Sequence, residues 1–197
     1  LDSTLTIAAN GTLSAPRGDL TLEDHFINNG TYTHNSGTLK WTDNTNQTAE
    51  IAGSTNTTFY NITTLEGGYH APEIDTSCTI ENLWTNIHSR ISGGATVTMG
   101  TASASGTIAN AATAGFDFNG NTTNASKIAA ASSLYPAIIT TSAGDAFDWD
   151  SGGSGSKVEL ENVDIRFETT TGGNGVTITL TGDCEFDAVT VSSGDTL

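Results

Sequence analysis

Basic residues are scarce in this sequence. Its 197 residues contain six Lys and Arg against 22 Asp and Glu, which gives a formal net charge of −16. A surface of that sign repels phosphate backbones and anionic lipid headgroups. We therefore expect no nucleic acid among its partners and no attraction to anionic membrane.

Long apolar runs are missing as well. No stretch approaches the roughly 20 apolar residues that a membrane-spanning helix needs, and no basic-plus-apolar leader stands at the start. Apolar residues nowhere keep the i, i+3, i+4 spacing of an amphipathic helix over about ten residues. We expect no membrane insertion. Because both Leu1 and Leu197 adjoin strand-like patterns, we also expect a piece of a longer protein or a processed product.

Charged residues make up 14% of the chain and aromatic residues 7%, whereas Thr, Ser, Asn and Gly dominate. So few charges argue against a chain kept disordered by its own repulsion. Thr suits strands, while Asn and Gly suit turns. This composition indicates an ordered, turn-rich β protein.

One pattern recurs along the chain and is clearest in KVELENVDIRF, residues 157–167. Val158 and Leu160 alternate on one side, a Glu161-Asn162 corner follows, and Val163 and Ile165 return to that side. Further copies start at Leu20, Thr57, Cys78 and Cys184, with inward slots at the first, third, sixth and eighth positions. Their spacing predicts a coil of about 20 to 26 residues with irregular loops, as in solenoid proteins.

The two cysteines occupy the first slot of their copies, 106 residues apart. If each coil adds about 4.8 Å, four or five coils separate Cys78 from Cys184 by about 20 Å. A disulfide needs Cα atoms within about 7 Å. We therefore predict two buried free thiols.

Residues 26–63, FINNGTYTHNSGTLKWTDNTNQTAEIAGSTNTTFYNIT, resemble the repeats of long extracellular β-solenoid proteins, including bacterial surface adhesins and the fibre, spike and decoration proteins of tailed phages. Residues 146–197 resemble right-handed parallel β-helix coils. The resemblance implies a solenoid scaffold on a virion surface or another extracellular surface. It also implies contacts with virion or surface proteins, glycans as possible ligands, and a homo-oligomer, with a trimer favoured by the phage proteins.

The predicted fold is therefore all-β, a right-handed parallel β-helix or related solenoid formed as one domain by residues 1–197, with a β-sandwich as the alternative. We expect a non-catalytic structural protein of an exterior surface, most simply a phage virion component. A cell-surface adhesin or filament module is one alternative, and a polysaccharide-degrading β-helix is a second.

A depolymerase would need two carboxylates roughly 5 to 10 Å apart. The best candidates are Asp145, Asp148 and Asp150, with Asp164 from the next coil. Arg166 should lie beside Asp164, where a surface salt bridge is the simpler interpretation. An Asn-Thr-Asp turn, an Asp-Asp pair and a Gly-His-Gly are absent from the sequence, as is a cluster of Arg and Lys. No catalytic residue is therefore assigned.

Residues 148–159 resemble a calcium-binding EF-hand loop in spacing, with Asp148, Asp150 and Glu159 as candidate Ca²⁺ ligands. Gly152 stands where an oxygen ligand is needed, and Glu159 falls in a predicted strand. A Gly-Ser turn with acidic flanks is the favoured interpretation. We predict no metal and no other cofactor.

Aromatic side chains could stack on sugars, and Trp41, Tyr32 and Tyr60 are the candidates. Trp41 alternates with Leu39 and is more simply a core residue. His25 falls in an inward slot, which favours a packed or hydrogen-bonded imidazole over a metal ligand.

Overall fold

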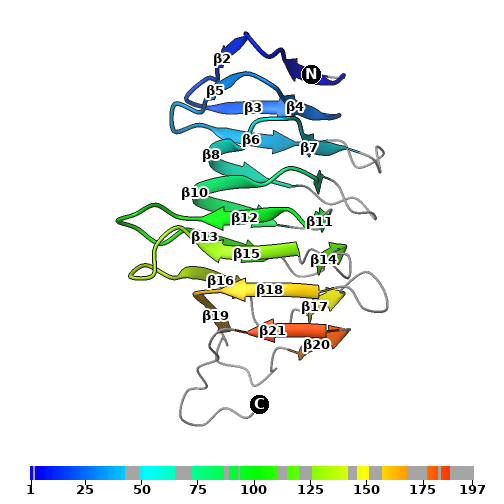
Figure 1. The fold of residues 1–197 in the computed structure, drawn as a ribbon, viewed down its shortest axis with the longest axis vertical. Coiled ribbons are helices and arrows are strands. Elements are labelled where there is room, and N and C mark those ends of the chain that lie inside the picture. Colours follow the sequence, from blue (N-terminus) through cyan, green and yellow to red (C-terminus); the bar gives the residue numbers. More distant parts are fainter. Residues whose placement is uncertain are drawn as a thin grey trace.

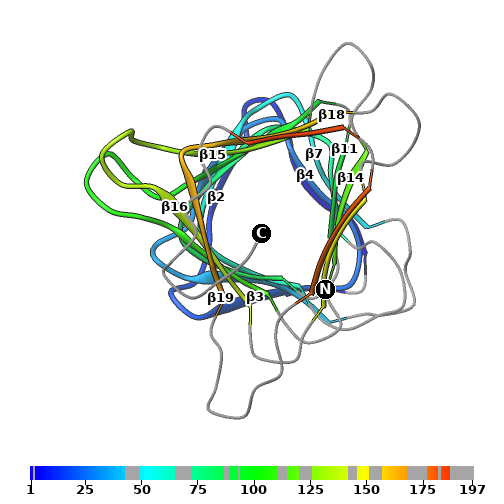
Figure 2. The same cartoon turned by 90° about the horizontal axis from the view of Figure 1, so that it is seen from below.

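The structure is a computed structural model that describes residues 1, 3–42, 49–64, 72–86, 89–92, 94–110, 115–119, 126–141, 146–150, 157–167, 177–181 and 183–186. All of its elements within these residues are β-strands, numbered β1 to β21, and the ladders between them are parallel. The strands stack as a solenoid with a three-sided cross-section (Figures 1 and 2). The predicted solenoid is confirmed, and a sandwich of antiparallel sheets is excluded.

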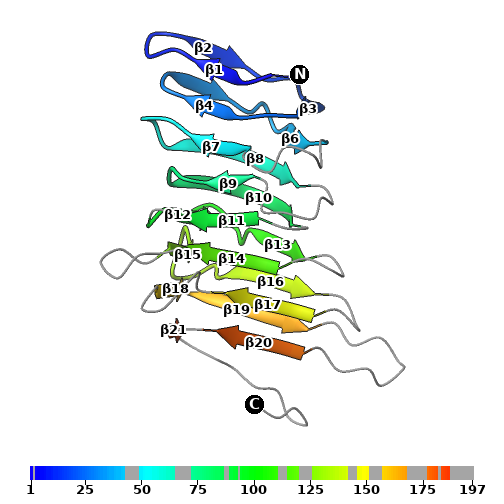
Figure 3. The ribbon, with the colours of Figure 1, turned by 90° about the vertical axis from the view of Figure 1, so that its right-hand side faces the viewer.

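The first face is an eight-stranded sheet that receives one strand from each turn of the chain (Figure 3). Its strands are β1 (Leu5–Ile7), β4 (Phe26–Asn28), β7 (Glu50–Ala52), β9 (Glu73–Ile74), β11 (Ser89–Ser92), β14 (Gly115–Asn119), β17 (Ala146–Asp150) and β20 (Thr177–Thr181).

The second and third faces share two long strands that bend at the corner between them, β8 and β10. The second face holds β2 (Thr12–Ser14), β5 (Thr31–Thr33), the first halves of β8 (Thr57–Thr63) and β10 (Cys78–Asn86), β12 (Thr96–Met99), β15 (Ser126–Ala130), β18 (Lys157–Glu161) and β21 (Asp183–Phe186). The third face holds β3 (Asp19–Leu22), β6 (Thr38–Trp41), the second halves of β8 and β10, β13 (Thr107–Asn110), β16 (Ala137–Thr141) and β19 (Val163–Phe167).

The length of a turn varies more than the sequence pattern predicts. Residues paired across the first face are 21, 25, 23, 17, 27, 33 and 31 positions apart, from the pairs Leu5 with Phe26, Phe26 with Ile51, Ile51 with Ile74, Ile74 with Ile91, Ile91 with Phe118, Phe116 with Trp149 and Trp149 with Leu180. The predicted range of 20 to 26 residues holds for three turns and is wrong for the others. Strand pairing fixes the strands, whereas the connections between them are free to differ.

Apolar side chains form continuous ladders inside the stack. On the third face the paired residues Leu39, Ile62, Trp84, Ile108 and Ile139 are all buried. Each fully buried aliphatic side chain contributes about 1.5–3 kcal/mol of hydrophobic stabilisation. Because every turn covers the core of its neighbours, the turns stabilise one another.

The eight-position template describes β8 correctly and β10 only in part. Thr57, Phe59, Ile62 and Thr64 are all buried, as predicted. In β10, two residues between Ile80 and Leu83 face a single residue of β8, so the register shifts. Trp84 is therefore buried in place of Leu83, and the prediction that Leu83 and Thr85 point inward is wrong.

The weakest copy of the template, starting at Leu20, also fails in its second half. Phe26 and Asn28 are buried, whereas His25 and Ile27 are only partly buried. Three residues, at 23–25, separate the inward residues here, where the template allows two. The clearest copy keeps its predicted corner, because Asn162 adopts a left-handed backbone with φ of 55°.

Cys78 is buried and free, as predicted. Four strand spacings separate β10 from β21, through β12, β15 and β18, which places the Cys184 backbone about 19 Å along the stack. Burial raises the pKa of the Cys78 thiol from 9.0 to about 12. Cys78 therefore serves as a small apolar core residue.

Candidate functional site

The main charged feature is a column of charged residues that pair with one another along the first face. Glu50 pairs with Glu73, Glu73 with Arg90, Arg90 with Asp117, and Asp117 with Asp150. Each residue comes from a successive turn, so the column runs along the stack. Alternation in the strands leaves Glu50, Glu73 and Arg90 partly exposed, because the next residues, Ile51, Ile74 and Ile91, take the buried positions.

Arg90 and Glu73 form an ion pair within this column. Arg90 Nη1 lies 3.8 Å from Glu73 Oε2, and about a quarter of each side chain is exposed. An ion pair with this much solvent contributes at most about 1 kcal/mol. It lowers the repulsion between the acidic residues of neighbouring turns more than it adds stability of its own.

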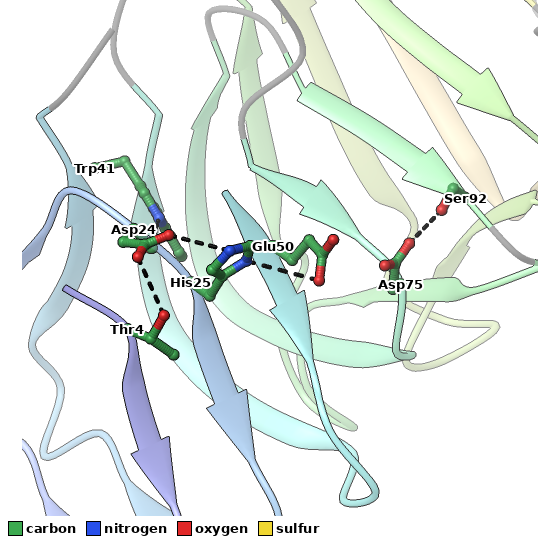
Figure 4. A network of polar contacts seen from close by, with 7 residues as sticks. All are labelled: Thr4, Asp24, His25, Trp41, Glu50, Asp75 and Ser92. Carbon is green, nitrogen blue, oxygen red and sulfur yellow. Dashed lines mark hydrogen bonds and ion pairs between the residues drawn. The ribbon is translucent and has the colours of Figure 1, made fainter. Parts of the chain in front are cut away.

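His25 lies beside the N-terminal end of the column, between two carboxylates (Figure 4). Its Nε2 is 3.1 Å from Asp24 Oδ1, and its Nδ1 is 3.6 Å from Glu50 Oε2. The second distance is an electrostatic contact and too long for a hydrogen bond. The imidazole is three-quarters buried and is held by neighbouring carboxylates, which agrees with the packed histidine predicted above.

Asp24 is positioned by contacts from two other turns of the solenoid. Thr4 Oγ1 donates to Asp24 Oδ2 over 3.1 Å, and the indole Nε1 of Trp41 donates to the Asp24 carbonyl over 3.0 Å. Together with the contact between His25 and Glu50, these interactions connect three successive turns at one corner. This arrangement links neighbouring turns of the stack through polar side chains.

A second polar link occurs farther along the first face. The Ser92 hydroxyl donates a short hydrogen bond to Asp75 Oδ1, which joins the residue after β9 to the end of β11 (Figure 4). In the part of the chain that the structure describes, no group of three or more His, Cys, Asp and Glu side chains is arranged to hold a metal ion.

The predicted catalytic carboxylates that the structure describes come from strands on different faces. Asp148 and Asp150 lie in β17 on the first face, whereas Asp164 is exposed in β19 on the third face. Asp164 therefore belongs to a different face from Asp148 and Asp150, because consecutive strands of one turn lie on different faces. Asp145 lies outside the described residues, as does the Arg166 side chain in the predicted pair with Asp164.

The calcium candidates are likewise divided between faces. Asp148 and Asp150 belong to β17, and Glu159 lies in β18 on the second face, paired with Lys127 and Glu185. The prediction that Glu159 lies in a strand is confirmed. The connection at 151–156 falls outside the described residues.

The candidate sugar-stacking aromatics have different roles. Trp41 is buried in the core, as predicted. Tyr32 packs edge-on against Phe26, with ring centroids 5.3 Å apart, and burial raises the pKa of Tyr32 to about 12. Tyr60 stacks on His34 at 5.8 Å. Trp41 and Tyr32 are therefore packing residues, and one face of the Tyr60 ring is occupied by His34.

The charged column could not be found from the sequence. Its members Glu50, Glu73, Arg90, Asp117 and Asp150 are separated by 23, 17, 27 and 33 positions, so no fixed period connects them. Only the strand pairing shows that they are neighbours. The signal available in the sequence was alternation inside each strand, which assigns residues to the two sides of that strand but does not align one turn with the next.

Comparisons with known proteins identify no relative. No family model matches the chain, and neither the curated proteins nor the solved structures contain a significant match. Among the described residues, no helix has the length and apolar character needed to cross a bilayer.

Proposed function

We propose that this protein is a non-catalytic structural component of an exterior surface, and that it belongs to a phage virion as a fibre, spike or capsid decoration protein. The observation that supports this function is the stack of parallel ladders over one continuous core, with the first face unbroken from β1 to β20. Stacked turns give a stiff rod whose length is set by the number of turns. The resemblance of residues 26–63 to repeats of extracellular solenoid proteins supports the location.

The polar links between turns suit a load-bearing rod. The contacts of Asp24, His25 and Glu50 connect three turns, and the Asp75–Ser92 contact connects two more. The partners that this role requires are other virion or surface proteins and further copies of the chain. A cell-surface adhesin or filament module would use the same rod, and the location decides between the two.

Immunogold electron microscopy tests the location. Antibodies against the whole chain are applied to phage particles and to cells from the same source. We expect label on particles. Label confined to the cell wall would support the adhesin and contradict the virion assignment, and label confined to the cell interior would contradict both.

A reducing-sugar assay with host polysaccharides tests the non-catalytic part of the proposal. We expect no release by the wild-type chain. Release that is lost in Asp150→Asn and kept in Asp164→Asn, which changes a carboxylate on a different face, would place a depolymerase site on the first face and overturn the proposal.

A further inference from the structure

The outer side of the third face combines uncharged residues with large aliphatic side chains. In its central turns the outward residues are Leu83, Thr85, Thr107, Ala109, Ile138 and Thr140, which we call the neutral face. The pairing of β10 with β13 places Leu83 beside Thr107, and the pairing of β13 with β16 places Thr107 beside Ile138. All six are partly exposed, because the neighbouring Trp84, Ile108 and Ile139 take the buried positions. Two large aliphatic side chains therefore lie in one outward column.

The charges at the two ends of this face are balanced. Asp19 and Lys40 lie at the N-terminal end, where Lys40 Nζ is 3.6 Å from Asp19 Oδ2. Asp164 and Arg166 follow Ile138 and Thr140 in the ladder at the other end. Strands β3, β6 and β19 thus bring two acidic and two basic residues to the ends of this face, in a chain whose net charge is −16.

A protrusion borders the neutral face at the corner with the second face. It consists of the connections at 100–106 and 131–136, which extend from adjacent turns (Figure 2). Neither connection contains a charged residue. Leu134 is 82% exposed and Tyr135 is 39% exposed.

The protrusion is held in place by hydrogen bonds of its own backbone. Thr101 N donates to the Ala104 carbonyl over 2.8 Å, and Leu134 N donates to Ser132 Oγ over 3.2 Å. Asn162 Nδ2, from the next turn, donates to the Ser132 carbonyl over 2.7 Å. An apolar group fixed in this way loses little conformational entropy when it is covered.

We infer that the neutral face and the protrusion form a contact surface for a second copy of this chain, giving a dimer of two solenoids packed side by side. Two copies that each carry −16 repel over most of their surface, and this face lets them meet without placing like charges together. Because a flat sheet face is covered by one partner, the geometry points to a dimer, whereas the resemblance to phage proteins favours a trimer.

The area of the contact surface sets the expected affinity of the dimer. The three strands of the neutral face, about 4.8 Å apart and each about four residues long, cover roughly 200 Å² in projection, and all seven strands of the third face cover roughly 450 Å². The third face thus provides about half of the roughly 800 Å² per partner that stable complexes bury. The protrusion and the uneven surface of the side chains add to this area. The dimer should therefore form in a concentration-dependent way. This inference goes beyond the proposed function, since it holds for any location of the protein.

Sedimentation equilibrium of the full chain at several concentrations tests the inference. We expect a monomer–dimer equilibrium in the wild type. In Thr107→Glu, which places a carboxylate from each copy at the contact, the dissociation constant should rise at least tenfold. Thr98→Glu is the matched control: Thr98 is an equally half-buried outward threonine of the same turn, but it lies on the second face. It should leave the dissociation constant within about twofold of the wild-type value.

Ile138→Thr removes apolar area without adding charge and should weaken the dimer severalfold. Far-UV circular dichroism and urea unfolding show that each variant is folded, so a loss of association is not a loss of structure. A wild-type chain that stays monomeric at about 100 µM, a mass other than the dimer, or an equal effect of Thr98→Glu and Thr107→Glu would overturn the inference.

Discussion

Trp84 of β10 pairs with Ile62 of β8, and both side chains are fully buried. The pairing exists because β10 carries one residue more than β8 before the corner, which reverses the side of the strand that faces the core. The same shift turns Leu83 outward onto the neutral face. One extra residue thus sets both a large part of the core and a side chain of the proposed dimer contact.

Replacing Trp84 should therefore destabilise the protein far more than replacing its neighbour. Trp84→Ala leaves a cavity in a fully buried position and should lower the free energy of unfolding by about 4 kcal/mol. Leu83→Ala, on the outer side of the same strand, should cost less than about 1 kcal/mol. Urea unfolding measures both values. Similar costs for the two variants would contradict the register shift.

Gly53 should tolerate no side chain. Its φ is +128°, and a Cβ there would lie 2.1 Å from the carbonyl oxygen of Asn28. Asn28 is itself buried, and its Nδ2 donates to Thr57 Oγ1 over 2.9 Å. Gly53→Ala should cost about 3 kcal/mol or more. Gly18→Ala is the control, since nothing lies within 4 Å of its Cβ position, and its melting temperature should stay near that of the wild type.

Asn162 should contribute to the stability of the fold in two separate ways, through its backbone conformation and through its side chain. Asn162→Ala loses the hydrogen bond to Ser132 and places an alanine at φ of 55°, so we expect a loss of about 2 kcal/mol. Asn162→Gly loses only the hydrogen bond, and about 1 kcal/mol should be lost. If Asn162→Gly melts at a lower temperature than Asn162→Ala, the left-handed backbone at position 162 is not the source of the effect.

Alkaline pH should destabilise the fold through two buried groups. Burial raises the pKa of Cys78 from 9.0 to about 12 and that of Tyr32 from 10.0 to about 12. The unfolded chain therefore releases these protons first, so stability is full below about pH 9 and declines as the pH rises toward 12.

Urea midpoints between pH 8 and 11.5 measure this decline, and Tyr32→Phe should flatten it above pH 10. In the folded protein at pH 8, Cys78 should resist a thiol reagent that labels it at once in urea. Rapid labelling of Cys78 without denaturant would contradict its burial.

Several parts of the fold follow from local sequence. Alternation in Thr57–Thr64 placed four residues correctly, and the two-residue shift in alternation at Glu161-Asn162 placed the corner, where Asn162 adopts a left-handed backbone. Where the template failed, at His25 and Leu83, the number of residues at the corner had changed by one. Because the side-chain period in a strand is two, one extra residue reverses every assignment that follows it.

The candidate catalytic residues show what local sequence could not predict. Asp148 and Asp150 are close in sequence to Asp164, yet β17 and β19 lie on different faces, and the neighbour of Asp150 in the ladder is Asp117. No local pattern contains that information, because it depends on how many residues each loop uses before the chain returns to the same sheet.

The sequence by itself determined that the protein is an acidic, all-β chain built from short strands that turn around an apolar core. Thr, Asn and Gly decide this through strand and turn preferences that act within a few residues. Only the tertiary structure decided which residues become neighbours along the stack: the charged column from Glu50 to Asp150, and the neutral face with Leu83 and Ile138. The physical reason is that pairing between turns joins residues 17 to 33 positions apart in the sequence. This separation depends on the lengths of the loops, which the strand patterns do not determine.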